Sequence, residues 1–175
     1  MIIDTISIDL QKVAKKSVFY TLFALVFLLL VDSIIHQEFL LSISFVGVIL
    51  TVFGYLLLIL AHELTHLIGF KCFGQVSFRK MKIGVDFKKG VAYATMPDPI
   101  TNSAMQKSLL LPLWLTGILP GLIGIYLHSG VLLLLSALLI GGAAGDLAMY
   151  KELRRFPKEQ LILDDPHEPQ LHVLK

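Results

Sequence analysis

The residues best suited to chemistry lie in one apolar stretch, LLLILAHELTHLIGF, at residues 56–70. His62 and His66 are four residues apart, so on a helix their side chains share one face. Two such imidazoles can bind one zinc ion, and Glu63 can then take a proton from a water molecule on that ion. Ionisable groups inside a membrane helix cost about 2.5–3.5 kcal/mol each on insertion scales. The pattern therefore predicts a metal site, with a polar helix-packing cluster as the alternative.

The rest of the chain is apolar enough for a membrane protein. Hydrophobic residues make up 55% and charged residues 16% of the 175 residues, whereas soluble domains contain about 25% charged residues. Four stretches reach the roughly 20 apolar residues that a spanning helix needs. The expected fold is an all-α membrane protein, residues 1–175 forming one domain with four transmembrane helices. The spans are expected at about residues 17–35, 39–70, 108–127 and 131–150.

Lysine and arginine are distributed unevenly between these spans. The N-terminal segment, the long loop after the second span and the C-terminal tail are basic, whereas the other two loops contain neither residue. Because cytoplasmic segments carry the excess of Lys and Arg, we expect a multi-pass protein of the cell membrane with both termini in the cytoplasm. No basic patch interleaved with aromatic residues is present, so no nucleic-acid partner is expected. The lipid bilayer is the expected surrounding, and the oligomeric state is not indicated.

The long basic loop has a pattern of its own. SFRKMKIGVDF alternates apolar and polar residues, KKG is a turn signal, and VAYATM is a second short strand pattern before PDP. These features predict a cytoplasmic-side β-hairpin at about residues 76–96, with a solvated loop as the alternative. The tail at residues 151–175 contains three prolines and is expected to be an irregular extension.

The expected topology narrows the choice of a third zinc ligand. His36 and His128 belong to the loops on the far side, whereas His62 is near the cytoplasmic end of its span. Asp146 lies about 15 residues into the fourth span, which is about 22 Å along a helix, so it approaches the same end. His167 and His172 in the tail are further candidates, but Asp146 is preferred.

Small residues precede this aspartate at intervals of four. Such residues allow two helix backbones to approach closely, which a carboxylate as short as Asp146 needs in order to reach a metal on a neighbouring helix. Plain helix packing is the other interpretation of these residues, and both can hold. The third span also contains residues that kink membrane helices or serve ordinary helix packing. The small residues of the fourth span are Ala137, Gly141 and Gly145. The residues of the third span are Pro112, Gly117, Pro120, Gly121 and Gly124.

Three motifs together resemble a known family. They are AHELTHLIGF on the second span, AYATMPDPI before the third, and GDLAMYKELRRFPKEQLILDDPHEP from the fourth span into the tail. The chain thus resembles the bacterial putative zincin peptidase family, membrane proteins of unknown function that are related to site-2 intramembrane proteases. The resemblance extends from about Tyr55 to Pro169. Gly-Asp-Leu replaces the Leu-Asp-Gly of site-2 proteases, and no asparagine precedes it, so the group that stabilises the oxyanion is not identified.

The resemblance implies the same roles as the spacing does. His62, His66 and Asp146 correspond to the Zn²⁺ ligands, and Glu63 corresponds to the catalytic glutamate. The sequence therefore predicts a zinc metalloprotease that cleaves membrane-anchored proteins or peptides near the cytoplasmic face, with the hairpin holding an unwound substrate as an added strand. The alternative is a non-proteolytic zinc-binding membrane scaffold. A zinc transporter is disfavoured, because the outer halves of the spans are expected to lack acids and histidines.

Overall fold

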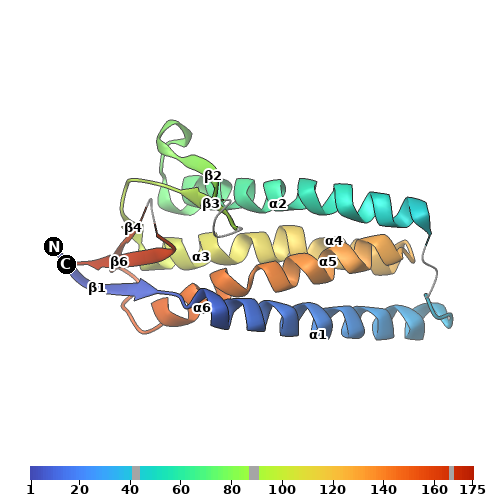
Figure 1. Ribbon diagram of the computed structural model, residues 1–175. Coiled ribbons are helices and arrows are strands. Elements are labelled where there is room, and N and C mark those ends of the chain that lie inside the picture. Colours follow the sequence, from blue (N-terminus) through green and yellow to red (C-terminus); the bar gives the residue numbers. More distant parts are fainter. Residues whose placement is uncertain (41–43, 87–90, 166–167) are drawn as a thin grey trace. The chain divides into compact units, whose positions relative to one another are not determined.

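The structure is a computed structural model that describes residues 1–40, 44–86, 91–165 and 168–175. The described residues are mostly helical, with two small β-sheets (Figure 1). They divide into two compact units, which are described separately below. The first unit is Met1–Leu10, His62–Pro112 and Gly145–Lys175, and the second is Gln11–Ala61 and Leu113–Ala144. The expectation of a single domain stays a prediction.

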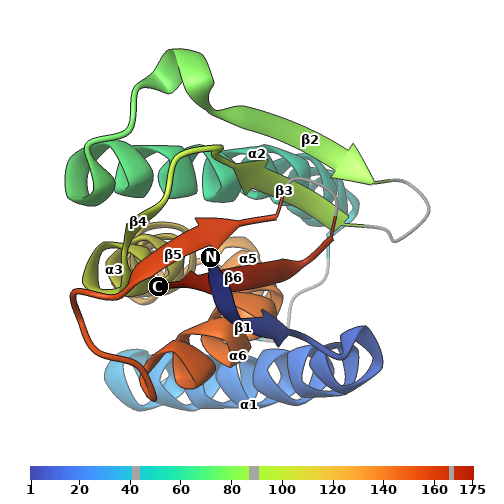
Figure 2. The same cartoon turned by 90° about the vertical axis from the view of Figure 1, so that its left-hand side faces the viewer.

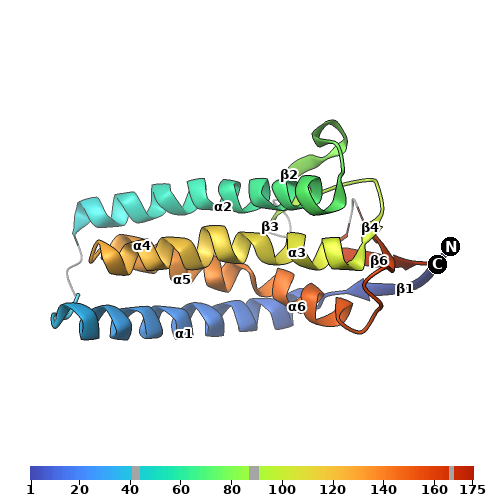
Figure 3. The ribbon, with the colours of Figure 1, turned by 180° about the vertical axis from the view of Figure 1, so that it is seen from behind.

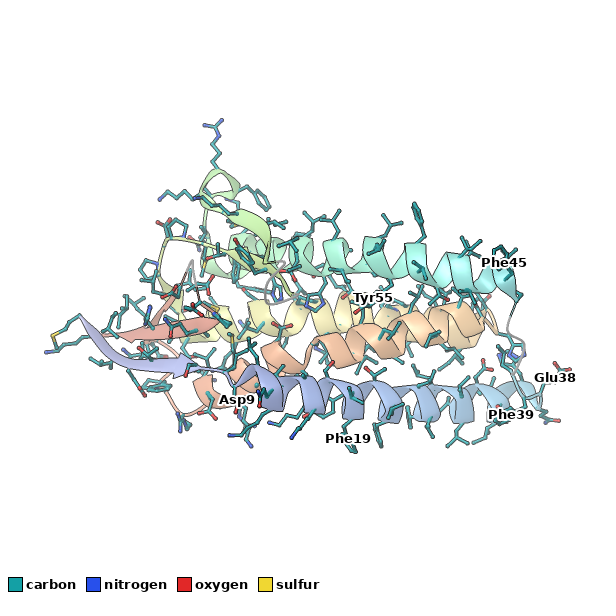
Figure 4. All side chains as sticks on the ribbon, in the orientation of Figure 1. Asp9, Phe19, Glu38, Phe39, Phe45 and Tyr55 are labelled. Atoms are coloured by element: carbon teal, nitrogen blue, oxygen red, sulfur yellow. The ribbon has the colours of Figure 1, made fainter. Side chains whose placement is uncertain are left out.

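Three helical segments are long and apolar enough to cross a membrane. They are α1 (Leu10–His36), α2 (Phe45–Gly74) and the segment Asn102–Tyr126. A bent helix pair makes a fourth candidate if it is counted as one span. Large apolar side chains on these helices are exposed, among them Phe19 on α1 and Phe45 on α2 (Figure 4). Such exposure is expected of helices that face lipid rather than water.

Two of the four predicted spans are interrupted helices. The third comprises α3 (Asn102–Pro112), a π-helix (Leu113–Ile118) and α4 (Leu119–Tyr126). The fourth comprises α5 (Gly130–Gly142) and α6 (Ala144–Leu153), which meet at an angle of 40°. The fourth predicted span is thus a bent pair of helices, and the consecutive glycines before Ala143 weaken the helix at the bend. The second span was also predicted to begin at about residue 39, whereas residues 39–40 are not helical and α2 begins at Phe45.

The first unit contains a four-stranded antiparallel sheet in the order β1-β6-β5-β4 (Figure 2). The expectation of an irregular tail was wrong, because two of these strands come from the tail. Leu171 and Val173 on β6 and Ile162 on β5 are fully buried. An irregular tail would expose these apolar side chains to water, whereas the sheet buries them on one face. The strands are β1 (Ile2–Ser7), β4 (Ile100–Thr101), β5 (Leu161–Asp164) and β6 (Gln170–Leu174).

One hydrophobic core joins this sheet to the helices of the first unit. It contains Phe70 of α2, Met105 of α3 and Leu153 of α6 together with the buried strand residues. Asn102 at the start of α3 is fully buried, and its side-chain amide donates to the carbonyls of Leu153, Phe156 and Pro157. This amide satisfies carbonyls that the end of α6 leaves without helical partners, so the positions of α3 and α6 are fixed relative to each other.

The predicted hairpin is present as the two-stranded sheet of β2 (Lys82–Asp86) and β3 (Val91–Thr95). The strand pattern was wrong at its start, because Phe78–Lys80 is a turn of 3₁₀-helix. The predicted KKG turn lies outside the described residues. Gly84 pairs with Tyr93, and a Cβ added at Gly84 would lie 2.4 Å from Cζ of the tyrosine ring. The ring therefore covers the position where the apolar alternation is interrupted.

In the second unit, small residues bring the helices into close contact. A Cβ added at Gly141 of α5 would lie 2.7 Å from the carbonyl oxygen of Ser17 on α1, and one at Gly121 of α4 would lie 2.5 Å from Ser136 Oγ on α5. Figure 3 shows α4 and α5 side by side. The third-span glycines thus serve helix packing, which was one of the two interpretations. At Gly141 the close contact is with α1, so at this position the small residue serves helix packing, which was one of its two interpretations.

Candidate metal centre

Helix α2 places the two histidines of the motif on adjacent turns. The ring centroids of His62 and His66 are 5.1 Å apart. Both residues are buried, with 8% and 6% of their surface exposed. Thr65 Oγ1 donates to the carbonyl oxygen of His62 at 2.6 Å, so the buried hydroxyl has its hydrogen-bond acceptor within α2. The sequence expectation of one shared face is therefore met by the helix geometry.

Asp146 contacts both histidines from the first turn of α6. Its Oδ2 lies 3.1 Å from His62 Nε2, and its Oδ1 lies 3.4 Å from His66 Nε2. One ligand atom from each of the three residues lies within 4.8 Å of the others. Asp146 follows directly after the break at Ala143. A change of helix direction within a run of small residues thus precedes the carboxylate.

His66 has a second partner that determines its tautomer. Its Nδ1 lies 3.1 Å from the carbonyl oxygen of Ser108 on α3. A carbonyl can only accept, so Nδ1 carries the hydrogen, and the lone pair of the neutral ring is on Nε2, the nitrogen that faces Asp146. A histidine that binds a metal usually donates its other ring N–H to such an acceptor.

Two features of α2 and α3 make the Ser108 carbonyl reachable. Pro112 is four residues after Ser108 and has no N–H, so the usual helical bond to this carbonyl cannot form. Gly69 lies one turn after His66 on α2, and a Cβ there would be 2.8 Å from Ser108 Cα. The two backbones can approach this closely only with glycine at that position. Neither role was apparent in the sequence.

The three side chains suit zinc in type and in spacing. Ligand atoms about 2.0–2.1 Å from a tetrahedral zinc ion are about 3.3 Å from one another, and the two contacts to Asp146 measure 3.1 and 3.4 Å. Three protein ligands leave one position open for water or substrate. Glu63 is buried beside this group, and its carboxylate interacts electrostatically with all three side chains. The donor set, the spacing and the bond from His66 to Ser108 therefore all fit a catalytic type of zinc site.

The other histidines named in the sequence lie elsewhere. His172 on β6 contacts Asp165 Oδ2 at 2.9 Å and Thr5 Oγ1 at 3.1 Å. His167 lies outside the described residues. His36 and His128 form a separate cluster in the second unit with Asp32, which the sequence analysis did not single out as a ligand.

The family model described as "Putative zincin peptidase" matches residues 55–161, which is more than half of the chain. The chain belongs to this family. No curated protein and no solved structure matches it. The resemblance read from the motifs is thereby confirmed, and similarity to site-2 proteases stays a prediction. Membership in a zincin family implies zinc, and the matched range of the zincin peptidases includes His62, Glu63, His66 and Asp146.

Proposed function

We propose that the protein is a zinc-dependent endopeptidase that hydrolyses membrane-associated proteins or peptides near the cytoplasmic face. The observation that carries this proposal is the buried group of His62, His66 and Asp146, whose mutual distances suit one zinc ion, with Glu63 next to it in the sequence. Membership in the zincin peptidase family supports the same reaction class.

Each residue has a role that follows from its chemistry. His62, His66 and Asp146 hold the ion. A zinc ion supplies a Lewis acid that polarises a peptide carbonyl and lowers the pKa of a water molecule towards about 7. Glu63 is not required as a ligand, so its carboxylate accepts a proton from the attacking water and returns it to the leaving amine. Burial of the group limits access of bulk water and thereby strengthens these electrostatic interactions.

The location follows from charge and apolar surface. The helices that are long and apolar enough to span a membrane are flanked by basic segments at the N-terminus, in the loop after α2 and in the tail. Both termini and this loop are then cytoplasmic. His62 and His66 are in the second half of α2, towards that loop, which supports a reaction in the cytoplasmic half of the membrane.

The hairpin is the proposed docking edge for the substrate. A peptide bond within a stable helix is inaccessible, so a membrane-anchored substrate must unwind before it is cleaved. Among the described residues β2 and β3 pair only with each other, so each has one open edge. An unwound segment can add to such an edge as a further strand through backbone hydrogen bonds. The hairpin and the histidine cluster belong to the same unit.

Glu63→Gln tests the proposal and separates it from the scaffold alternative. Glutamine has nearly the same shape but cannot accept the proton, and loss of a general base typically lowers a rate by about 10²–10⁴-fold. We expect uncleaved substrates to accumulate in the membrane proteome of cells that carry Glu63→Gln, while the purified variant keeps its zinc. Glu152→Gln is the matched control, because Glu152 is on the surface of α6 and pairs with Arg155. Identical membrane proteomes for wild type and Glu63→Gln would favour the scaffold.

A further inference from the structure

A second group of metal-ligating side chains lies in the second unit. Asp32 and His36 are one turn apart on α1, and His128 follows α4 in the turn before α5. One ligand atom from each lies within 4.8 Å of the others. Asp32 and His36 precede the range that matches the zincin peptidase family. Asp32 also corrects an expectation from the sequence, because it is an acid in the outer half of the first span.

Asp32 is the unusual member of this group. It is fully buried, and neither of its carboxylate oxygens has a hydrogen-bond partner among the described residues. His128 Nδ1 lies 2.9 Å from Asp32 Oδ2, yet this nitrogen also lacks a hydrogen bond among those residues, so the two atoms are close without being aligned as donor and acceptor. A buried carboxylate is costly unless a cation compensates for it. An aligned ion pair would offset the burial of the Asp32 carboxylate through hydrogen bonds, and these are missing among the described residues. A metal ion would need only the lone pairs of the carboxylate and imidazole groups.

A backbone carbonyl fixes the tautomer of His36. Its Nε2 lies 2.8 Å from the carbonyl oxygen of Ile125 on α4. Because the carbonyl can only accept, Nε2 carries the hydrogen and the lone pair of the neutral ring is on Nδ1. The Ile125 carbonyl thus has the place of an outer-shell partner. His66 in the first cluster differs, because it donates to the Ser108 carbonyl through Nδ1 and faces Asp146 with Nε2.

The backbone of His128 is in a conformation that histidine rarely adopts. Its φ is 48°, and its N–H bonds to the carbonyl of Ile125 while that of Ser129 bonds to the carbonyl of Gly124. These two bonds define a helix C-terminus whose left-handed residue is usually glycine. A side chain in this region costs roughly 1 kcal/mol. Histidine at this position is therefore less favourable for the helix end than glycine, and its ring lies against Asp32.

We propose that Asp32, His36 and His128 bind a second transition-metal ion of the Zn²⁺ class. His128 Nδ1 and Asp32 Oδ2 are 2.9 Å apart, near the spacing of about 3.3 Å between tetrahedral zinc ligands, and one ring nitrogen of His36 lies within 4.8 Å of the other ligand atoms. A ligand set of two imidazoles and one carboxylate favours zinc, whereas magnesium and calcium favour oxygen ligands. The imidazoles are partly exposed, each with 30% of its side-chain surface accessible, so the ion can enter. It links the end of α1 to the α4–α5 turn.

Zinc stoichiometry of the full chain tests this site independently of the first cluster. The purified protein in detergent is stripped with a chelator, dialysed against limiting free Zn²⁺ and analysed for metal and protein content. We expect about two zinc ions per chain for the wild type and about one for a His62→Ala/His66→Ala variant, since each site takes one ion. Adding Asp32→Asn to that variant should remove the remaining ion. His172→Gln is the control, because it removes a histidine outside both clusters and should keep about two ions.

The outcomes separate this site from the proposed peptidase site. Loss of one ion in Asp32→Asn alone, with Glu63-dependent cleavage retained, supports the second site. If Asp32→Asn fails to give a monodisperse helical protein, His128→Gln is measured instead, because this residue is at the surface of the turn. About one ion in the wild type and none in His62→Ala/His66→Ala would overturn the second site and leave the first intact. Two ions that survive both Asp32→Asn and His128→Gln would overturn it as well.

Discussion

Replacement of Pro112 by alanine is expected to weaken zinc binding, although proline has no ligand atom. Alanine restores a backbone N–H four residues after Ser108, where it can form the helical bond to the Ser108 carbonyl. That carbonyl now accepts the Nδ1–H of His66 at 3.1 Å. A regular helix in place of the π-helix at Leu113–Ile118 would also turn the carbonyl towards its own helix axis. His66 then loses the partner that fixes its ring.

The size of the effect follows from the single bond that is lost. A hydrogen bond of this kind contributes a net ~0.5–1.5 kcal/mol, and loss of an outer-shell partner typically lowers metal affinity by about 10–100-fold. We therefore expect the Kd for zinc to rise by roughly tenfold, which corresponds to ~1.4 kcal/mol. The stability of the fold should change in the opposite direction, because an internal proline costs a helix about 3 kcal/mol. Unfolding cannot then explain the weaker binding.

The measurement is a zinc titration in competition with a chelator, combined with thermal unfolding of the metal-free protein. Pro120→Ala is the matched control. It restores a helical N–H in the same span, four residues after Thr116, and both residues belong to the second unit, whereas the His62 cluster belongs to the first. Pro120→Ala should leave the Kd of the His62 cluster within about twofold. An unchanged Kd in a more stable Pro112→Ala protein would refute the role given to the Ser108 carbonyl.

Three further perturbations test other parts of the structure. Gly69→Ala should lower the free energy of unfolding by several kcal/mol and lower the zinc content, because its Cβ would lie 2.8 Å from Ser108 Cα. A variant with wild-type stability and wild-type zinc content would contradict this. Tyr93→Pro removes a donor from β3 and should impair cleavage while zinc content stays normal; intact cleavage would exclude strand addition. Burial raises the pKa of Asp164 to about 6 from 3.8, so ionisation opposes folding and stability should fall as the pH rises from about 4 to 6. Asp164→Asn should reduce this fall by at most about 3 kcal/mol, and parallel unfolding curves against pH would contradict the shift.

The candidate ligands could be predicted because helical geometry acts over short range. His62 and His66 needed only a spacing of four and an apolar helix, and that helix is present as α2. Asp146 could be placed near them by counting residues along a span. The small residues before it were less informative, since Gly141 packs against Ser17 of α1. Position along a helix follows from the sequence, whereas the face that a small residue turns towards depends on which helices become neighbours.

The four-stranded sheet could not be predicted in the same way. Its strands are only two to six residues long, and β1 pairs with β6 from the opposite end of the chain, with Ile6 opposite Leu171. Short strands of this kind gain stability from the shared core rather than from their own pattern. Asp32 is a different case, because its spacing of four from His36 was readable on α1. The partner His128 comes from another helix end and required the fold.

The α2 histidines contact Ser108 and Asp146, and each of these residues lies next to an irregularity in its own helix. Backbone chemistry explains why. A regular helix in an apolar environment uses its interior carbonyls in its own hydrogen bonds, so it has few acceptors to offer a neighbour. Pro112 removes one donor from the helix that contains Ser108, and a histidine N–H from α2 takes its place. The interruption at Ala143 similarly precedes the turn that contains Asp146. The motif on α2 therefore contains two candidate ligands, and their partners come from places where the other helices depart from regular geometry.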